Sequence, residues 1–228
     1  MKIGVIADIH SNLSAFKAVL EDMPRVDQIV CAGDLVGYAA EPNEVVDLAK
    51  SKRLQVVMGN HDYAAVTRDA RGFNPLAAQA ALWTADKLTI ENFKFLSNLP
   101  THLKLSFAKQ KLYLVHGSPR DPLNEYIFPD VPNPELAQVV KNVNADVLVL
   151  GHTHVPMSRM MLGRLVVNPG GVGQPRDRNP NASYAVLTLG KKIWVEHRRV
   201  KYDTGDVAKK IKIAGLPEEL AARLFFGW

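Results

Sequence analysis

The stretch KIGVIADIHSNLSAFKAVLEDM, residues 2–23, places an apolar run, a polar motif and a helix-like segment in direct succession. Residues 3–7 have the character of a short buried strand, and the apolar residues from Leu13 to Met23 recur at helical spacing. Further apolar runs at 28–31 and 54–58 are separated by an expected helix at 41–50. This βαβαβ order predicts a parallel sheet with right-handed crossovers.

Each of these three runs ends in a polar motif. Asp8-Ile9-His10 follows the first run, Gly33-Asp34 the second, and Gly59-Asn60-His61-Asp62 the third. In open α/β sheets, ligands bind at the carboxyl ends of the strands. We therefore expect three motifs that are far apart in the chain to lie close together.

The rest of the chain continues as a mixed α/β protein. Residues 62–99 are expected to be helical and to form an insertion beside the site within a single domain of residues 1–228. Strands are expected at 102–107, 111–115, 147–150 and 164–167, a helix near 135–142, and a hairpin of 184–189 with 193–200. The tail at 206–228 is expected to be helical until Gly227. Its apolar end, Leu224 to Trp228, either folds back onto the body, which we favour, or forms a contact in a homo-oligomer.

Composition narrows the classes of protein. The chain has 228 residues, of which 47% are hydrophobic, so it can bury a substantial core. Its apolar runs are much shorter than the roughly 20 residues of a membrane span, and no signal-peptide core follows Met1, so no membrane partner and a cytoplasmic location are expected. The single cysteine, Cys31, excludes an internal disulfide and is expected in the core. The net charge of +5 is dispersed, which favours a solvated surface over a nucleic-acid partner.

Two further histidine motifs follow expected strands. His116 comes after 111–115 and His152-Thr153-His154 after 147–150, so that five of the seven histidines lie in such motifs. Each motif alone could be a polar turn, but all of them fall at strand ends. Imidazole, carboxylate and amide groups without a thiolate suit two divalent cations, with Mn, Fe, Ni, Co and Zn all compatible. Asp34 is suited to bridge two ions about 3.5–4 Å apart.

The motif series D-x-H, G-D, G-N-H-D, H and G-H-x-H, spanning residues 8–154, resembles that of the calcineurin-like metallophosphoesterase superfamily. The segment Asn168 to Asp177 is similar to a loop of its small prokaryotic phosphodiesterase branch, where a serine often stands at the position of Gly171. The resemblance implies a four-layer αββα sandwich of two facing mixed sheets, with manganese as the first choice of metal. It implies one metal held by Asp8, His10 and His154, a second held by Asn60, His116 and His152, and Asp34 as the bridge.

The predicted activity is hydrolysis of a small or nucleotide-like phosphodiester by a hydroxide that bridges two metal ions. His61 is expected to hydrogen-bond a phosphoryl oxygen or to protonate the leaving group, with Asp62 orienting its ring. Asn12, Gln174 and Arg176 are candidate substrate contacts. The alternatives are a phosphomonoesterase or a dinucleoside-polyphosphate hydrolase, with the insertion deciding between them, and then a nuclease. A non-catalytic scaffold, like the retromer subunit of this fold, is disfavoured because the ligands and His61 are all present.

Overall fold

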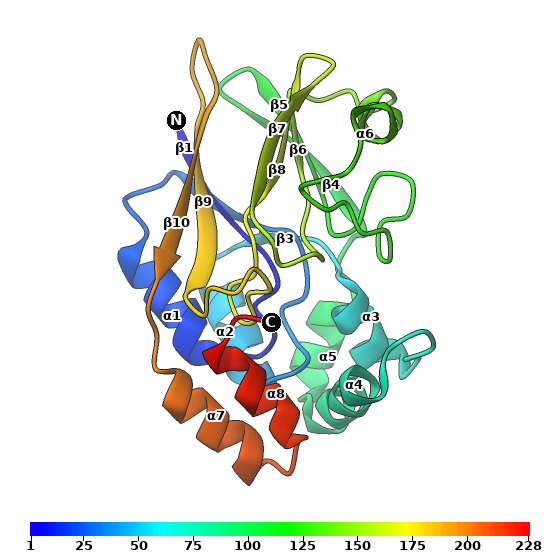
Figure 1. Cartoon of the computed structure of the whole chain (residues 1–228), viewed down its shortest axis with the longest axis vertical. Coiled ribbons are helices and arrows are strands. Elements are labelled where there is room, and N and C mark those ends of the chain that lie inside the picture. The colour runs from blue at the N-terminus through cyan, green and yellow to red at the C-terminus, as the bar shows by residue number, and fades with distance from the viewer.

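Two mixed β-sheets face each other in the computed structural model, which describes residues 1–228 (Figure 1). In spatial order the first sheet contains β10 (Trp194–Val200), β9 (Ala182–Thr188), β1 (Lys2–Ile6), β2 (Gln28–Cys31) and β3 (Gln55–Val56). The second contains β4 (His102–Phe107), β5 (Gln110–Val115), β6 (Val147–Val149), β8 (Arg164–Asn168) and β7 (Met157–Met161). The pairs β1–β2, β2–β3, β5–β6 and β6–β8 are parallel, and the other neighbours are antiparallel.

Helices lie outside the two sheets. They are α1 (Leu13–Asp22), α2 (Pro42–Ser51), α3 (Asn60–Thr67), α4 (Pro75–Lys87), α5 (Ile90–Ser97), α6 (Asn133–Val140), α7 (Thr204–Ile213), α8 (Glu218–Ala222) and the 3₁₀ helix η1 (Arg223–Phe225). Apolar side chains of α1, α2 and α5 pack on the first sheet, and α6 packs on the second. A third cluster fills the space between the sheets, where β1 meets β5 and β6. The predicted sandwich of two mixed sheets between helices is confirmed, and Cys31 is buried in its core.

The structure differs from the sequence-based expectation in three places. Residues 62–99 form three separate helices, and the first of them, α3, begins at Asn60 inside the polar motif itself. The first break ends at Asn74, whose side chain caps α4 at the Ala77 amide, and the second lies at residues 88–89. The tail at 206–228 is not one helix, because Gly215, with a φ of 71°, and Pro217 separate α7 from α8. The strand β7 was not anticipated, because Met and Arg are weak strand formers and its alternating burial emerges only from pairing with β8.

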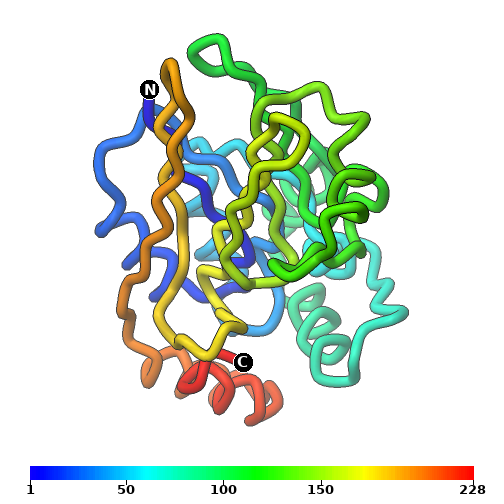
Figure 2. The backbone as a smooth tube through the Cα atoms, turned by 45° about the horizontal axis from the view of Figure 1, so that its top comes forward, coloured from blue at the N-terminus to red at the C-terminus, as the bar shows by residue number.

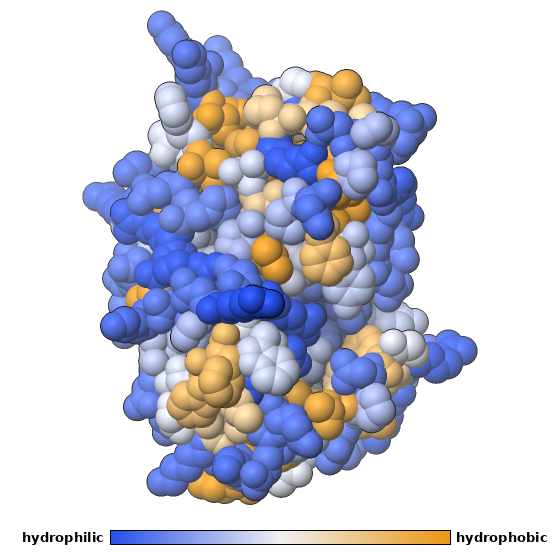
Figure 3. Space-filling model, viewed as in Figure 1, coloured by the Kyte–Doolittle hydropathy of each residue, from blue (hydrophilic) through white to orange (hydrophobic).

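The C-terminal segment packs back onto the body of the protein. Side chains of α7, α8 and η1 form a cluster with α4 and with the loop after β2, and Leu224 at its end is 3% exposed. Leu224 therefore folds back onto the body, as expected for the apolar end of the chain. The side chains of Phe225, Phe226 and Trp228 are more than half exposed. Figure 3 shows apolar surface over the region of α8, and Figure 2 shows the C-terminal end beside the yellow segment that precedes β9. No helix combines the length and apolarity that crossing a bilayer requires.

Candidate metal centre

Loops from the carboxyl ends of five strands meet at one edge of the sandwich. Strands β1, β2 and β3 of the first sheet and β5 and β6 of the second lead directly into the motifs singled out above. All seven side chains expected as ligands are buried there, the most exposed being Asn60 at 9%. Two groups of three side chains each place their ligand atoms within 4.8 Å of one another. They are Asp8 with His10 and His154, and Asp34 with His116 and His152. Asn60 joins the second group through its Oδ1 atom, 2.9 Å from Nε2 of His116.

Backbone carbonyls fix the orientation of four imidazole rings. The contacts are His10 Nδ1 to the Val36 oxygen at 3.1 Å, His116 Nδ1 to Ala32 at 2.7 Å, His152 Nε2 to Asn124 at 3.3 Å, and His154 Nδ1 to Gln174 at 2.5 Å. Because a carbonyl oxygen only accepts hydrogen bonds, the nitrogen that faces it carries the ring proton. The other nitrogen of each neutral ring therefore presents a lone pair, which is the arrangement that metal-ligating histidines show.

These lone pairs point at one another. Nε2 of His10 lies 3.2 Å from Nε2 of His154, and Nε2 of His116 lies 3.0 Å from Nδ1 of His152. Two acceptor nitrogens at such a distance repel each other unless a cation or a proton lies close to both. The donor set therefore fits divalent cations.

The two carboxylates complete this arrangement. One oxygen of each is anchored, because Asp8 Oδ1 accepts from the His152 amide at 3.1 Å and Asp34 Oδ1 from the His61 amide at 2.9 Å. The second oxygen of each is buried without a hydrogen-bond partner. Oδ2 of Asp34 lies 3.6 Å from Nε2 of His10 and 3.4 Å from Nε2 of His116, between the two imidazole pairs. This is the position that a bridging carboxylate would need.

Burial shifts the ionisation of these groups away from charge. It raises the pKa of Asp8 well above its usual value and that of Asp34 to about 7. It lowers the pKa of His116 to about 4 and that of His152 to about 2. The imidazoles are consequently neutral ligands at pH 7, and a bound dication would reverse the shift of the acids.

The backbone at the centre is held in a conformation that is rare for residues with a side chain. Asp8, His10, Asp34, His152 and His154 have φ angles of 56°, 51°, 56°, 67° and 58°, in the left-handed region. Gly59 allows the close approach of two strand-end loops, because a Cβ atom there would overlap the carboxylate of Asp34. Strain of this kind persists where the surrounding structure imposes it, and it concentrates at functional sites.

His61 lies beside the candidate metal centre, where a ring nitrogen is within 4.8 Å of ligand atoms of His10 and Asp34, but no backbone carbonyl orients its ring. Its ring centroid is 4.4 Å from that of Tyr38 and 4.6 Å from that of Phe73, and its Nδ1 atom is buried without a partner. Burial, and next the charge of Arg176, lower the pKa of His61. The neighbouring Gly37 has a φ of +96°, and a Cβ atom there would lie 2.6 Å from Nδ1 of His61. The position of this ring therefore depends on a glycine.

Asp62 does not orient the His61 ring as expected. Its Oδ2 atom accepts from the amides of Asp34 at 2.9 Å and Gly59 at 3.0 Å, and its Oδ1 atom accepts from the amide of Val36 at 3.1 Å. Adjacency in the GNHD motif suggested a partnership with His61, but two amides at the left-handed turn after β2 and the Gly59 amide after β3 need an acceptor. Asp62 thus fastens the loop after β2 to the loop after β3.

The three expected substrate contacts fall into two groups. Asn12 is fully buried and occupied, since Oδ1 caps α1 at the Ala15 amide at 3.0 Å and Nδ2 donates to the Gly173 oxygen at 2.9 Å. The expectation that Asn12 contacts substrate is therefore wrong, and its capping role explains it. Gln174 and Arg176 do lie beside the centre. Nη2 of Arg176 donates to Gln174 Oε1 at 3.1 Å and to the Tyr38 hydroxyl at 3.0 Å.

An open cleft of about 630 Å³ lies over the centre. His61 and His152 line its floor, and Tyr38, Phe73 and Tyr126 are aromatic side chains in its wall. The ring of Tyr126 stacks on that of His152 with centroids 3.7 Å apart. No sequence motif marks these aromatic residues, because each lies in a loop and reaches the site only through the fold.

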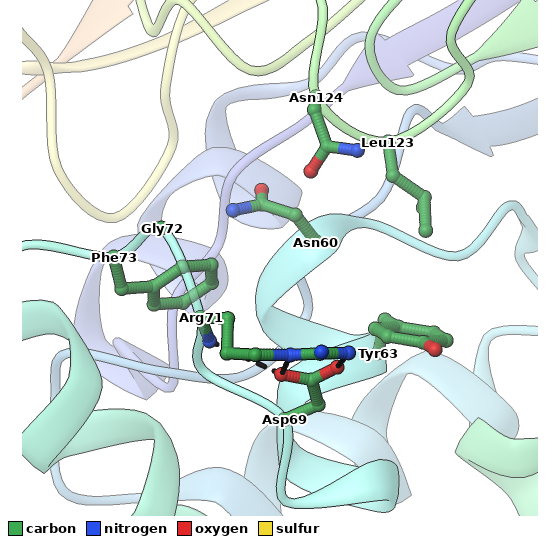
Figure 4. A pocket seen from close by; sticks show the side chains of 8 residues that line it. All are labelled: Asn60, Tyr63, Asp69, Arg71, Gly72, Phe73, Leu123 and Asn124. Atoms are coloured by element: carbon green, nitrogen blue, oxygen red, sulfur yellow. Dashed lines mark hydrogen bonds and ion pairs between the residues drawn. The ribbon is translucent and has the colours of Figure 1, made fainter.

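A second pocket of about 530 Å³ adjoins the cleft and shares five lining residues with it, Asn60, Arg71, Gly72, Phe73 and Asn124. Figure 4 shows the side chains of Asn60 and Asn124 facing each other across this pocket. Below them Arg71 pairs with Asp69, with Nε donating to Oδ1 at 2.8 Å. The helical segment α3–α4 thus forms one side of the space above the centre, and the loop after β5 forms the other.

Comparisons with known proteins agree with this geometry. A sequence model described as the calcineurin-like phosphoesterase superfamily domain matches residues 1–192. The uncharacterized protein MJ0912 of Methanocaldococcus jannaschii is 38% identical, and the match covers 99% of this chain and 98% of that protein. Phosphodiesterase YfcE of Escherichia coli K12 is 29% identical over 82% of this chain and 87% of its own. The crystal structure of a metallophosphoesterase from Sphaerobacter thermophilus has a TM-score of 0.88 at 36% identity, covering 100% of this chain and 99% of that one.

Proposed function

The chain belongs to the calcineurin-like phosphoesterase superfamily, a family of metal-dependent hydrolases of phosphoric esters, and from this premise we propose that it is a phosphodiesterase with a dinuclear metal centre. The observation that carries the proposal is the convergence of four imidazole lone pairs with two unpaired carboxylate oxygens in one buried volume. Such a set favours the binding of cations. The printed name of the Escherichia coli relative supports a diester as the substrate.

We assign the ligands in two sets that share one residue. Asp8, His10 and His154 would hold one cation, Asn60, His116 and His152 the other, and Asp34 would contact both. Manganese is the first choice, and the donor types also suit Fe, Ni, Co and Zn. When bound, two divalent cations supply the positive charge that lowers the pKa of a water molecule and neutralises phosphoryl oxygens.

The chain's own residues would position the ester and handle a proton. His61 faces the cleft as a neutral imidazole, so one ring nitrogen can donate a hydrogen bond to a phosphoryl oxygen or a proton to the departing alkoxide. Tyr126 and Phe73 provide flat apolar surface in the wall of the cleft. A planar group could stack there, which supports a small or nucleotide-like ester as the substrate class.

A comparison of two chromogenic esters tests this proposal. The chelated protein should be inactive, and manganese should restore hydrolysis of bis-p-nitrophenyl phosphate in preference to p-nitrophenyl phosphate. Elemental analysis of the active protein should give about two metal ions per chain. Preference for the monoester would instead support a phosphomonoesterase. Hydrolysis that survives complete chelation would contradict the metal-dependent mechanism.

A further inference from the structure

Arg223 contacts Tyr38, a residue of the cleft wall, from the C-terminal segment, beyond the residues 1–192 that the family model matches. Its side chain is partly buried, and Nε donates to the main-chain oxygen of Trp228. The amide of Gly227 donates to the Arg223 oxygen at 3.1 Å, and the Gly227 oxygen accepts from the amide of Arg178 at 2.8 Å. The tail is therefore fastened to the same loop that carries Arg176.

Tyr38 connects the two arginines to the metal centre. The guanidinium carbon of Arg176 lies 5.7 Å from the Tyr38 ring centroid, and that of Arg223 lies 5.8 Å from it. The same ring packs edge-on against His10, with centroids 4.6 Å apart. The Tyr38 ring thus lies between both guanidinium groups and the candidate ligand His10, and each guanidinium gains a cation–π contact with it.

Neither guanidinium pairs with an aspartate or glutamate side chain. Arg68, Arg71, Arg120, Arg198 and Arg199 form such ion pairs, whereas Arg176 and Arg223, like the five remaining arginines, form none. Nε of Arg223 is already used, because it donates to the Trp228 oxygen. Nε of Arg176 is buried without an acceptor, and so is Nε2 of Gln174, a residue that is only 2% exposed. The pKa of Arg223 is lowered, first by burial and then by the charge of Arg176. Two cations against one aromatic ring, with unused donors on Arg176 and Gln174, favour an anion that joins them.

We propose that Arg176 and Arg223, with Tyr38 between them and the metal centre, bind a second phosphate group of a substrate whose scissile phosphodiester lies over that centre. The planar fork of donors on each arginine matches phosphate oxygens better than an ammonium does. This inference rests on the proposed function for the position of the scissile group. It narrows the substrate class to phosphodiesters that carry a further phosphate.

Binding of two product-like nucleotides tests the site without requiring turnover. The manganese-loaded wild type should bind thymidine 3′,5′-bisphosphate about tenfold or more tightly than thymidine 5′-phosphate in titration calorimetry, the scale of one charge-assisted contact. Arg223→Gln should reduce this preference to about twofold or less, and Arg223→Lys should leave an intermediate value because it keeps the charge without the fork. Arg178→Gln, an exposed arginine in the same loop, is the matched control and should keep the wild-type preference.

Turnover separates this inference from the proposed function. The p-nitrophenyl esters of the same two nucleotides should show the same preference in kcat/KM, and Arg223→Gln should abolish it. A wild type without the preference, or an Arg223→Gln variant that keeps it, would overturn the inference even if both esters are cleaved. Loss of the binding preference in Arg223→Gln, with neither ester cleaved by the wild type, would support the anion site and overturn the proposed hydrolysis. If Arg223→Gln does not fold, Arg223→Lys decides: a preference below the wild-type value supports the inference, and an unchanged preference overturns it.

Discussion

Replacing Asp62 by asparagine tests whether this carboxylate stabilises the protein by joining the loop after β2 to the loop after β3. Its two oxygens accept three backbone amides, from Asp34, Val36 and Gly59, and the side chain is fully buried. An asparagine can place its one oxygen where Oδ2 accepts two of these amides. Its NH₂ group then faces the amide of Val36, which loses its acceptor.

The expected loss of stability follows from the number of buried donors that lose their acceptor. One buried donor left without a partner costs about 2 kcal/mol, within a range of roughly 1–3 kcal/mol. For a chain of this size, such a loss lowers Tm by roughly 4–8 °C. Asp62→Ala would leave three donors unpaired, at roughly 3–9 kcal/mol, which approaches the whole stability of about 5–15 kcal/mol that domains possess. The alanine variant is therefore expected to be largely unfolded.

Denaturant unfolding and thermal unfolding of the chelated protein measure this effect. Asp130→Asn is a matched control, because Asp130 is exposed and makes no hydrogen bond or ion pair, and it should change stability by less than about 0.5 kcal/mol. At temperatures well below its Tm and with saturating manganese, the Asp62→Asn variant should be as active as the wild type. An Asp62→Asn variant with wild-type stability and an activity loss of about a hundredfold would refute this structural role. It would favour a direct effect of Asp62 on the His61 ring.

Three further outcomes follow from the site. His61→Gln should retain its metal content but lose about a hundredfold in kcat with bis-p-nitrophenyl phosphate, and undiminished turnover would contradict the role of His61. Gly37→Ala should also lower kcat, because its Cβ atom would displace the His61 ring, and a crystal structure of the variant with that ring unmoved would argue against this explanation. Manganese binding should release more protons per chain at about pH 6 than well above pH 7, because Asp34, with a pKa raised to about 7, must ionise before it binds. Metal affinity therefore weakens as the pH falls below about 7. Calorimetry in buffers of different ionisation enthalpy measures the number of protons released. Equal proton release at both pH values would contradict this prediction.

Much of the fold and of the metal centre follows from local sequence. The motifs at Asp8, Asp34 and Asn60 follow apolar runs, and parallel strands bring such ends together, so their convergence could be foreseen. Asn12 had a local signal as well, since it immediately precedes a helical pattern, and the capping rule should have outweighed a substrate role. These inferences need only neighbouring residues and a sheet topology.

Other features depend on contacts between distant segments. Tyr38 and Arg223 are brought together only because the C-terminal helices pack against the loop after β2 and against α4. The true partners of Asp62 are backbone amides, which carry no residue-specific signal in a sequence. Which groups a buried polar side chain satisfies is decided by the packed structure, and neither periodicity nor spacing reports it.

The division of the ligands between the two sheets has a consequence for the maturation of the protein. Asp8 and His10 belong to the first sheet and His154 to the second, and the group of Asp34, His116 and His152 is divided in the same way. Neither of these two groups is complete on one sheet, whereas His10, Asp34 and His61 form a third group on loops of the first sheet alone. A site for two ions would therefore be complete only after the second half of the chain has docked on the first. An unfinished or half-unfolded chain would thus be free of hydrolytic activity, and metal loading would mark the completion of folding.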